Sequence, residues 1–455
     1  MEIVTRIVIV GGGPAGYEAA LVAVQLGAEV TLVDRDGVGG MCVLADCVPS
    51  KTLIATSEAM TDLSQAERVG VHAVGTVTVQ VAEVHARIKA LALAQSGDIT
   101  ARLLREGVSI ERGAARLLGG GKIEIVGRVL AADVVLVATG AHPRVVPGAE
   151  PDGERILDWR QLYDLSALPE HLVVVGSGVT GAEFASAYLA MGCDVTLVSS
   201  RDRVLPSEDP DAAEQLQQVF VRRGMRIRRG RAAGVSRAGD GVVVQLTDGS
   251  SVSGSHCLMT VGSVPNTGEL GLLEAGVELD DGGFVKVDRV SRTTAPGIYA
   301  AGDCTGVLML ASVAAMQGRI AMWHALGEAV APLRLGTVAA NVFTDPEVAS
   351  VGVTQRQVDD GTVLAQSVRL PLATNARAKM QGLTDGFVKL FCRPGSGTVL
   401  GGVVVAPRAS ELILPVSVAV QHGLTTDQLA HTFSIYPSLG GSITEAARQL
   451  MLHEA

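Results

Sequence analysis

Two cysteines, Cys42 and Cys47, are separated by four residues in the stretch GGMCVLADCVPSK, in a chain of 455 residues that has six cysteines. The pair raises the question of redox chemistry, in which the thiolate rather than the thiol is the nucleophile. The other four cysteines lie in apolar strand-like or turn segments without metal-ligand spacing, at positions 193, 257, 304 and 392. We expect these four to be buried, reduced thiols, as is usual in a reducing compartment.

A glycine-rich turn precedes the cysteine pair. Residues 6–10 (RIVIV) predict a strand, an Ala-rich helix follows to about Gln25, and a second strand ends in AEVTLVD at Asp34. Between the first strand and the helix, Gly11, Gly13 and Gly16 form the pattern G-x-G-x-x-G, which is the context that a dinucleotide-binding motif requires. The glycines allow backbone to approach a pyrophosphate, the helix N-terminus supplies partial positive charge, and Asp34 can accept a hydrogen bond from an adenosine ribose.

The same pattern recurs 165 residues further along the chain, in HLVVVGSGVTGAEFASAYLAMGCDVTLVS. Its glycines are Gly176, Gly178 and Gly181, and its second strand ends at Ser199. Two sites of the same physical type imply two bound dinucleotides.

The two repeats differ at the residue that is expected to contact the adenosine ribose, at the end of the second strand. Asp34 would repel a 2′-phosphate, whereas Ser199 and Ser200 remove that carboxylate, and Arg201 and Arg203 follow closely enough to pair with a phosphate. The second site therefore predicts NADPH in preference to NADH. The alternative interpretation is that both arginines are solvated loop charges.

Length and charge limit the classes of function. A chain of 455 residues has room for about three domains. Its formal net charge of −10 and the absence of a run of Lys and Arg argue against a nucleic-acid partner. The N-terminus has no signal-peptide pattern, and apolar stretches such as residues 411–420 are shorter than the ~20 residues that cross a bilayer. We expect a soluble, cytoplasmic protein without a transmembrane segment.

Taken together, these motifs resemble those of the flavoprotein disulfide reductases, which include lipoamide dehydrogenase and glutathione reductase. Further matching stretches are VVLVATG at 134–140, TVGSVPNT at 260–267, IYAAGDCTG at 298–306, VFTDPEVASVGVT at 342–354 and ASELI at 409–413. The resemblance implies an α/β fold with two Rossmann-like dinucleotide-binding domains and a C-terminal α+β dimerisation domain. The implied boundaries are 1–148 and 265–334 for FAD, 149–264 for NAD(P)H, and 335–455 for the dimerisation domain of a homodimer.

The resemblance also assigns residues to the flavin site. In such enzymes an Asp matching Asp303 binds the FAD ribityl chain, and a Lys matching Lys51 lies near flavin N5 with a Glu matching Glu183 as its ion-pair partner. Leu310 and Ala311 match the start of a helix whose N-terminus faces flavin N1 and O2, where its dipole would stabilise negative charge. Gly140, at the end of VVLVATG, belongs to the same implied FAD site, together with the first glycine motif and Asp34.

By the same resemblance, Cys42 is the interchange thiol and Cys47 the charge-transfer thiol next to flavin C4a. The family activates the interchange thiol with a His of the partner subunit that a Glu orients. In the corresponding segment, residues 431–450, Tyr436 occupies the position of the base and Gly441 that of the acid. Tyrosine has a pKa near ~10 and is a poor base at neutral pH, so we predict that the dyad is missing.

Two other residues of this segment could act in place of the dyad, but we expect otherwise. His431 is interpreted as a polar residue at a helix end, and Glu445 as part of a solvated helix face. Loss of a positioned acid–base typically costs ~10²–10⁴ in rate. In addition, the carboxylate of Asp46 disfavours a thiolate on Cys47.

The sequence therefore predicts an FAD-dependent oxidoreductase that passes electrons from NAD(P)H, with NADPH favoured, to a small-molecule acceptor of the quinone type. It resembles a lipoamide-dehydrogenase-like branch of NAD(P)H quinone reductases, although members of that branch can lack the interchange cysteine and this chain keeps Cys42. Three alternatives remain open: a disulfide reductase that uses Cys42 and Cys47, a soluble transhydrogenase, and a non-catalytic redox sensor.

Overall fold

The computed structural model describes residues 4–72, 74–75 and 77–451, and the chain forms two compact units. The first unit comprises Met1–Thr52, His85–Arg144 and Gly262–Arg334, and the second Leu53–Val84, Val145–Val261 and Leu335–Ala455. The outermost residues of the predicted FAD-binding and dimerisation domains, and the start of the N-terminal stretch considered above, lie outside the described residues.

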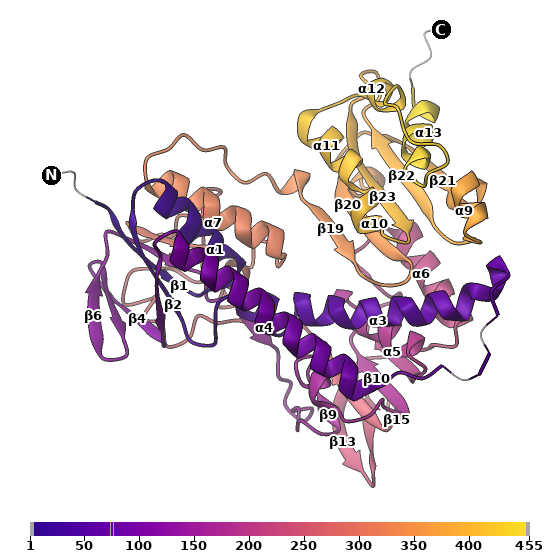
Figure 1. Cartoon of the computed structure of the whole chain (residues 1–455), viewed down its shortest axis with the longest axis horizontal. Coiled ribbons are helices and arrows are strands. Elements are labelled where there is room, and N and C mark those ends of the chain that lie inside the picture. Colours follow the sequence, from indigo (N-terminus) through magenta and orange to yellow (C-terminus); the bar gives the residue numbers. More distant parts are fainter. Residues whose placement is uncertain (1–3, 73, 76, 452–455) are drawn as a thin grey trace. The chain divides into compact units, whose positions relative to one another are not determined.

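The first unit is built on a parallel five-stranded sheet in the order β18-β7-β1-β2-β3. Helices α1 (Pro14–Gln25) and α7 (Ala311–Ala325) lie side by side on this unit (Figure 1). The inner strands are short apolar runs because both faces of a parallel sheet are covered, whereas the edge strand β3, with the sequence SIER, is largely polar. They are β1 (Arg6–Val10), β2 (Glu29–Asp34), β3 (Ser109–Arg112), β7 (Val134–Val137) and β18 (Ile298–Ala300).

Smaller elements complete the first unit. A three-stranded antiparallel sheet consists of β4 (Ala115–Gly119), β5 (Lys122–Ile125) and β6 (Arg128–Ala131), and β8 (Ala141–Pro143) pairs with β17 (Ser263–Pro265). The short helix α2 (Gly40–Leu44) leads into α3 (Cys47–Gln65), and α4 (Val81–Arg105) follows; α3 and α4 each extend into segments of the second unit.

The second unit repeats the parallel arrangement in a sheet of order β12-β11-β10-β16-β9. Its strands are β9 (Ile156–Leu157), β10 (His171–Val175), β11 (Asp194–Ser199), β12 (Arg226–Arg229) and β16 (His256–Met259), with helices α5 (Val179–Ala190) and α6 (Pro210–Arg222). An antiparallel sheet of β13 (Ala232–Ala238), β14 (Gly241–Leu246) and β15 (Ser251–Gly254) adjoins it.

The C-terminal part of the second unit is an antiparallel sheet with helices, in the strand order β19-β20-β23-β22-β21. The strands are β19 (Ala339–Val342), β20 (Glu347–Gly352), β21 (Gln366–Pro371), β22 (Phe387–Cys392) and β23 (Val399–Ala406). Among its helices are α10 (Ala409–Leu412), α11 (Leu414–His422), α12 (Thr426–Ala430) and α13 (Gly441–Gln449). The predicted α/β class with two Rossmann-like repeats is confirmed.

The two glycine turns have nearly the same backbone conformation. Gly11 and Gly176 have φ values of 112° and 116°, which favour glycine. A Cβ on Gly16 would lie 1.8 Å from the carbonyl oxygen of Gly11, and a Cβ on Gly181 would lie 1.9 Å from that of Gly176. The third glycine of each motif is therefore required because the helix packs directly on its own turn.

A buried lysine joins the C-terminal sheet to the dinucleotide-binding part of the second unit. Lys389 of β22 is 4 % exposed, and its Nζ lies 3.0 Å from Asp209 Oδ2 and 2.8 Å from Asp211 Oδ2. The Asp209 side chain also accepts hydrogen bonds from the backbone N–H groups of Asp211 and Ala212, which caps α6. The lysine charge is thus matched by carboxylates at a helix N-terminus.

Within the described residues, no helix combines the length and apolar character needed to cross a lipid bilayer.

Candidate functional site

A cavity of the first unit collects residues from several of the predicted motifs. It has a volume of about 180 Å³ and adjoins a second cavity of about 440 Å³, and both are lined by Gly11, Asp34, Asp36, Thr139 and Asn266. The smaller cavity is also lined by Gly13, Cys42, Asp46, Cys47, Gly140, Asp303 and Ala311. Tertiary structure therefore brings the first glycine motif, the cysteine pair and Asp303 to one place.

Backbone donors hold Asp34 in a fixed orientation at the end of β2. Its Oδ2 accepts a hydrogen bond from the N–H of Gly12 at 2.6 Å, and its Oδ1 accepts from the N–H groups of Asp36 at 2.8 Å and Gly37 at 2.6 Å. The carboxylate is thus held at the wall of the cavity, where it can accept from a ribose hydroxyl.

The remaining polar surroundings of the cavity also suit FAD. Helix α1 has no side-chain cap, and a Cβ placed on its N-cap residue, Gly13, would meet nothing within 4 Å, so a pyrophosphate can approach the helix N-terminus. Helix α7 likewise begins without a side-chain cap, after the N-cap residue Leu310 and with Ala311 at the cavity wall. Burial, and secondarily the charge of Asp46, raises the pKa of Asp303 to about 6. The residues present therefore fit FAD, and Asp303 is placed to bind a hydroxyl group.

The two cysteines lie in contact at this cavity as free thiols. Cys42 belongs to α2 and Cys47 begins α3, and their side chains share a hydrogen bond. This bond lowers the pKa of Cys42, whereas the bond together with burial raises the pKa of Cys47. The negative charge of a single thiolate is consequently favoured on Cys42.

Lys51 and Glu183 stand on helices of different units. Lys51 follows Cys47 by one helical turn in α3, within the first unit. Glu183 of α5 is 4 % exposed, and its Oε1 accepts a hydrogen bond of 2.9 Å from the backbone N–H of Phe343, within the second unit.

The second glycine turn is built like the first, but its ribose-reading position is neutral. The Ser199 hydroxyl lies 2.7 Å from the Ser177 hydroxyl, donates to the Arg201 carbonyl at 2.9 Å and accepts from the Arg201 N–H at 3.2 Å. The side chains of Arg201 and Arg203 are exposed, and no carboxylate of the described residues forms an ion pair with either. The glycine-rich turn has the form of a dinucleotide site, and the unpaired positive charges of Arg201 and Arg203 lie close in sequence to Ser199, the residue expected to contact the adenosine ribose.

In the segment 431–450, Tyr436 lies on the loop between α12 and α13. The Tyr436 side chain is 85 % exposed, and Gly441 is the first residue of α13. His431 caps the end of α12, with its Nδ1 2.9 Å from the carbonyl oxygen of Asp427. Glu445 is bonded to Arg448 at 2.7 and 2.8 Å, which lowers its pKa to about 2. The predicted roles of His431 as a helix-end residue and Glu445 as a helix-face residue are confirmed.

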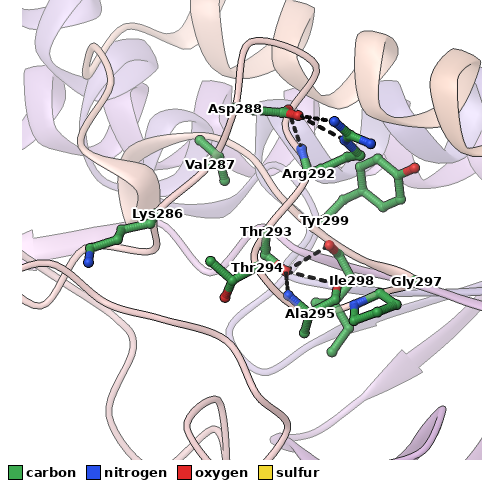
Figure 2. A pocket seen from close by; sticks show the side chains of 11 residues that line it. Lys286, Val287, Asp288, Arg292, Thr293, Thr294, Ala295, Gly297, Ile298 and Tyr299 are labelled. Atoms are coloured by element: carbon green, nitrogen blue, oxygen red, sulfur yellow. Dashed lines mark hydrogen bonds and ion pairs between the residues drawn. The ribbon is translucent and has the colours of Figure 1, made fainter.

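A wider cavity lies elsewhere on the first unit and has no lining residue in common with the two described above. It has a volume of about 540 Å³ and is lined by residues 286–288 and 292–299. Its polar side chains bond to other protein groups: Arg292 pairs with Asp288 at 2.8 Å and Thr293 Oγ1 donates to the carbonyl oxygen of Ile298 at 2.8 Å (Figure 2), and Lys286 pairs with Glu278 at 3.2 Å. No group there converges on a ligand position, so the catalytic site is not placed in this cavity.

Asn266 and Thr139 line the cavity but were absent from the predicted site. Asn266 donates to the carbonyl oxygen of Thr139 at 2.9 Å through its side chain and to that of Gly140 at 2.9 Å through its backbone. These hydrogen bonds connect the segment after β17 to the segment before β8, and both segments contribute to the wall of the cavity. The stretch TVGSVPNT contained the signal, but the role of Asn266 depends on its contact with residues 127 positions earlier.

The fold, the paired glycine turns and the cysteine-lined cavity define a class of flavin- and pyridine-nucleotide-dependent enzymes. Residues 5–318 match the family model described as "Pyridine nucleotide-disulphide oxidoreductase", and residues 338–447 match its dimerisation domain. The chain belongs to this family and is an oxidoreductase. Members of the family use FAD and NAD(P)H. The predicted family, fold class and cofactors are confirmed.

Individual proteins of this family are similar to the chain over nearly its whole length. The chain is 59 % identical to the NAD(P)H dehydrogenase (quinone) of Mycobacterium tuberculosis, over 99 % of this chain and 95 % of that one. It is 34 % identical to the dihydrolipoyl dehydrogenase of Chlorobaculum tepidum, over 97 % and 96 % of the two chains. The crystal structure of LpdA from M. tuberculosis, also 59 % identical, matches with a TM-score of 0.95 over 99 % of this chain and all of that one. The flavoprotein disulfide reductase RclA of Escherichia coli, 25 % identical, matches with a TM-score of 0.87 over 97 % and 99 %.

Proposed function

We propose that the enzyme passes electrons from NADPH, through bound FAD, to acceptors of the quinone type. When bound, FAD supplies the capacity to accept two electrons from a nicotinamide coenzyme and to release them to a second substrate. The observation that carries the proposal is the pair of Tyr436 and Gly441 at the positions where the resemblance calls for a His and a Glu. The identity of 59 % to an NAD(P)H dehydrogenase (quinone) supports the same acceptor class.

The surroundings of Tyr436 support the absence of a thiol-activating base. The Tyr436 side chain is 85 % exposed, on the loop between α12 and α13. Glu445 is held by Arg448, and His431 is held at the end of its own helix. The Glu445 carboxylate is thus already paired, and the bond at His431 occupies only its Nδ1, so the absence of a base is inferred from Tyr436 and Gly441. Reduction of a disulfide is therefore expected to be slow, whereas an acceptor that needs no thiol is unaffected.

The cysteine pair supports a second candidate function, which is disulfide reduction. The two thiols are in contact, and the lowered pKa of Cys42 makes it the better nucleophile of the two. Against this candidate stands the replacement of the expected His and Glu by Tyr436 and Gly441. We propose that the pair can close a disulfide which the main reaction does not use.

The preference for NADPH is proposed from the charges at the second glycine turn. Asp34 has no counterpart there, because Ser199 takes its place with a hydroxyl that bonds to Ser177. Arg201 and Arg203 are exposed and can reach a phosphate. The preference fails if NADH gives the higher kcat/KM, or if Arg201→Ala leaves the kinetics with NADPH unchanged.

The remaining site assignments are part of the same proposal. Asp34, Gly140, Asp303 and the N-terminus of α7 would hold FAD, and Lys51 would lie near flavin N5. The domain boundaries and the role of Glu183 are proposed as the resemblance implies them. A cytoplasmic homodimer is also proposed; three apolar side chains exposed by 81 to 104 % between α12 and α13 support a protein interface there, namely Phe433, Ile435 and Tyr436.

Steady-state assays with the purified flavoprotein test the acceptor. We expect NADPH oxidation with a naphthoquinone to exceed that with lipoamide or glutathione disulfide, and Cys42→Ser to leave the quinone rate within about twofold. Cys193→Ser is the control, because Cys193 is a buried thiol of the second unit. Disulfides turned over faster than quinones, with the activity lost in Cys42→Ser, would establish the second candidate instead.

An anaerobic titration with NADPH separates the two roles of the cysteine pair. Uptake of four electrons with a long-wavelength thiolate–flavin band indicates a redox-active bridge, whereas uptake of two electrons indicates flavin alone. The non-catalytic sensor requires negligible turnover with every acceptor, so measurable quinone reduction excludes it.

A further inference from the structure

An arginine outside the glycine motif lies at the ribose end of the second dinucleotide site. Arg229 is the last residue of β12, and it pairs in register with Ser199, the last residue of β11. Since side chains alternate between the faces of a sheet, partners in register project to the same face. The Ser199 side chain points to the glycine-rich turn, where it bonds to Ser177 at 2.7 Å. Arg229 is therefore placed on the dinucleotide side of the sheet.

The first repeat provides an internal comparison for this position. There β3 ends at Arg112, which pairs in register with Asp34. The residues that follow the two arginines also match: Gly113 has a φ of 157° and Gly230 a φ of 149°. The N–H of Gly113 donates to the Asp34 carbonyl at 3.0 Å, and the N–H of Gly230 donates to the Ser199 carbonyl at 2.9 Å. The two arginines thus occupy equivalent places in the two repeats.

What differs between the repeats is the negative charge beside the arginine. Arg112 stands opposite the carboxylate of Asp34 and near that of Asp36, whose pKa is lowered mainly by a hydrogen bond from Arg35 and additionally by Arg112. Arg229 stands opposite a serine hydroxyl instead. Neither Arg112 nor Arg229 forms an ion pair with a carboxylate of the described residues, so the repeats differ in the residue held in register with the arginine, which is an aspartate in the first repeat and a serine in the second.

The other arginines of β12 show that Arg229 is distinct. Arg226 pairs with Asp194 at 3.2 Å, and Arg228 pairs with Asp248 at 3.1 Å. Arg229 is exposed, and across the described part of the chain no carboxylate forms an ion pair with it. A phosphate dianion bound near Ser199 would complete its pairing, with charge-assisted hydrogen bonds of the kind that arginine forms with phosphates.

We propose that Arg229 binds the 2′-phosphate of NADPH and, together with Arg201, determines the choice of coenzyme. This inference rests on the proposed use of NADPH and goes further by assigning the phosphate to a specific strand end. The ligand class is a 2′-phosphorylated adenosine, and the recognition is independent of the quinone.

Binding of adenosine 2′,5′-bisphosphate to the holoenzyme tests the proposal without any catalytic turnover. We expect calorimetric titration to give a Kd for Arg229→Ala that is raised roughly 10- to 150-fold, the factor that a hydrogen bond to a charged group contributes. The Kd for adenosine 5′-monophosphate, which lacks the 2′-phosphate, should stay within about twofold. Arg226→Ala is the matched control, since it removes an exposed arginine of the same strand and should change neither Kd.

Arg229→Lys and the melting temperature separate binding from folding. The lysine variant keeps the charge, so it should retain part of the affinity for the bisphosphate. An equal loss of affinity for both nucleotides in the alanine and lysine variants, with a lowered melting temperature, would make Arg229 a structural residue and overturn the proposal.

Two further outcomes distinguish this proposal from the one on which it rests. Wild-type affinity of Arg229→Ala for the bisphosphate, with weakened binding in Arg201→Ala, overturns the role of Arg229 and leaves the NADPH preference standing. A wild-type enzyme that binds the bisphosphate no more tightly than the monophosphate overturns both assignments, and the quinone assay is unaffected by either result.

Discussion

Replacing Gly178 by alanine separates the binding function of the second glycine turn from its structural function. Gly178 has φ −74° and ψ −172°, an extended conformation that alanine adopts without strain. A Cβ at this position would meet nothing within 4 Å in the protein. We therefore expect a change in folding stability of no more than about 1 kcal/mol in Gly178→Ala, because the gain of about 0.4–1 kcal/mol from the less flexible unfolded chain offsets the lower preference of alanine for the N-cap of α5.

Binding of the coenzyme should nevertheless weaken. The second glycine of this motif lets backbone approach the pyrophosphate, and a methyl group would occupy that space. If the methyl group costs one hydrogen bond to a charged oxygen, about 1.5–3 kcal/mol is lost, which corresponds to a rise in KM for NADPH of roughly 10- to 150-fold. FAD content should remain at the wild-type level, because the first repeat is unchanged.

Gly181→Ala is the contrasting variant for this experiment. Its Cβ would lie 1.9 Å from the carbonyl oxygen of Gly176, whereas ordinary contacts begin at 3.4 Å, so the helix must move by 3.4 − 1.9 = 1.5 Å. Overpacking of this kind costs about 1–3 kcal/mol or more. Thermal unfolding and NADPH kinetics measured on both variants give the result. An unchanged KM in Gly178→Ala, or a larger loss of stability in Gly178→Ala than in Gly181→Ala, would refute the reasoning.

Three further predictions concern the rest of the chain. Lys389→Met leaves the buried Asp209 carboxylate without its cation and should lower the free energy of unfolding, measured by urea titration, by about 3–5 kcal/mol. Lys379→Met is the control; because Lys379 is exposed, this variant should keep the wild-type free energy of unfolding. In the flavin-free protein the pKa of Asp303 is raised to about 6, so the folded state keeps the Asp303 proton up to a higher pH than the unfolded chain does. The free energy of unfolding should therefore fall as the pH rises from about 4 to 6, and Asp303→Asn should reduce that fall. Phe433→Asp replaces an apolar side chain that is 104 % exposed in the single chain by a charged one, which would be buried without a partner in the proposed homodimer interface. Sedimentation velocity should therefore show a shift from dimer to monomer, and an unchanged dimer would contradict an interface at this loop.

The two strand–turn–helix–strand repeats could be predicted closely because local rules dominate there. The strand at Arg6–Val10, the helix ending at Gln25 and the strand ending at Asp34 match the prediction from the sequence. Apolar runs, a glycine turn and small helix residues all favour the same local structure, so no distant contact is needed to identify it.

Contacts between distant segments decided the remaining parts of the site. The sequence placed Cys42 and Cys47 near each other, but the order of their pKa values follows from their mutual hydrogen bond and burial. The role of Asn266 follows from its bond to Thr139, which lies in another strand segment.

The sequence by itself determined the family and the two dinucleotide turns, and it predicted the replacement of the acid–base pair by Tyr436 and Gly441, because each of these depends on residue types at short spacing. Only the tertiary structure placed Arg229 opposite Ser199, since strand register joins residues that are thirty positions apart and no local pattern encodes it. The same register in the first repeat places Arg112 opposite Asp34, and this comparison shows that the second repeat has no carboxylate at that position.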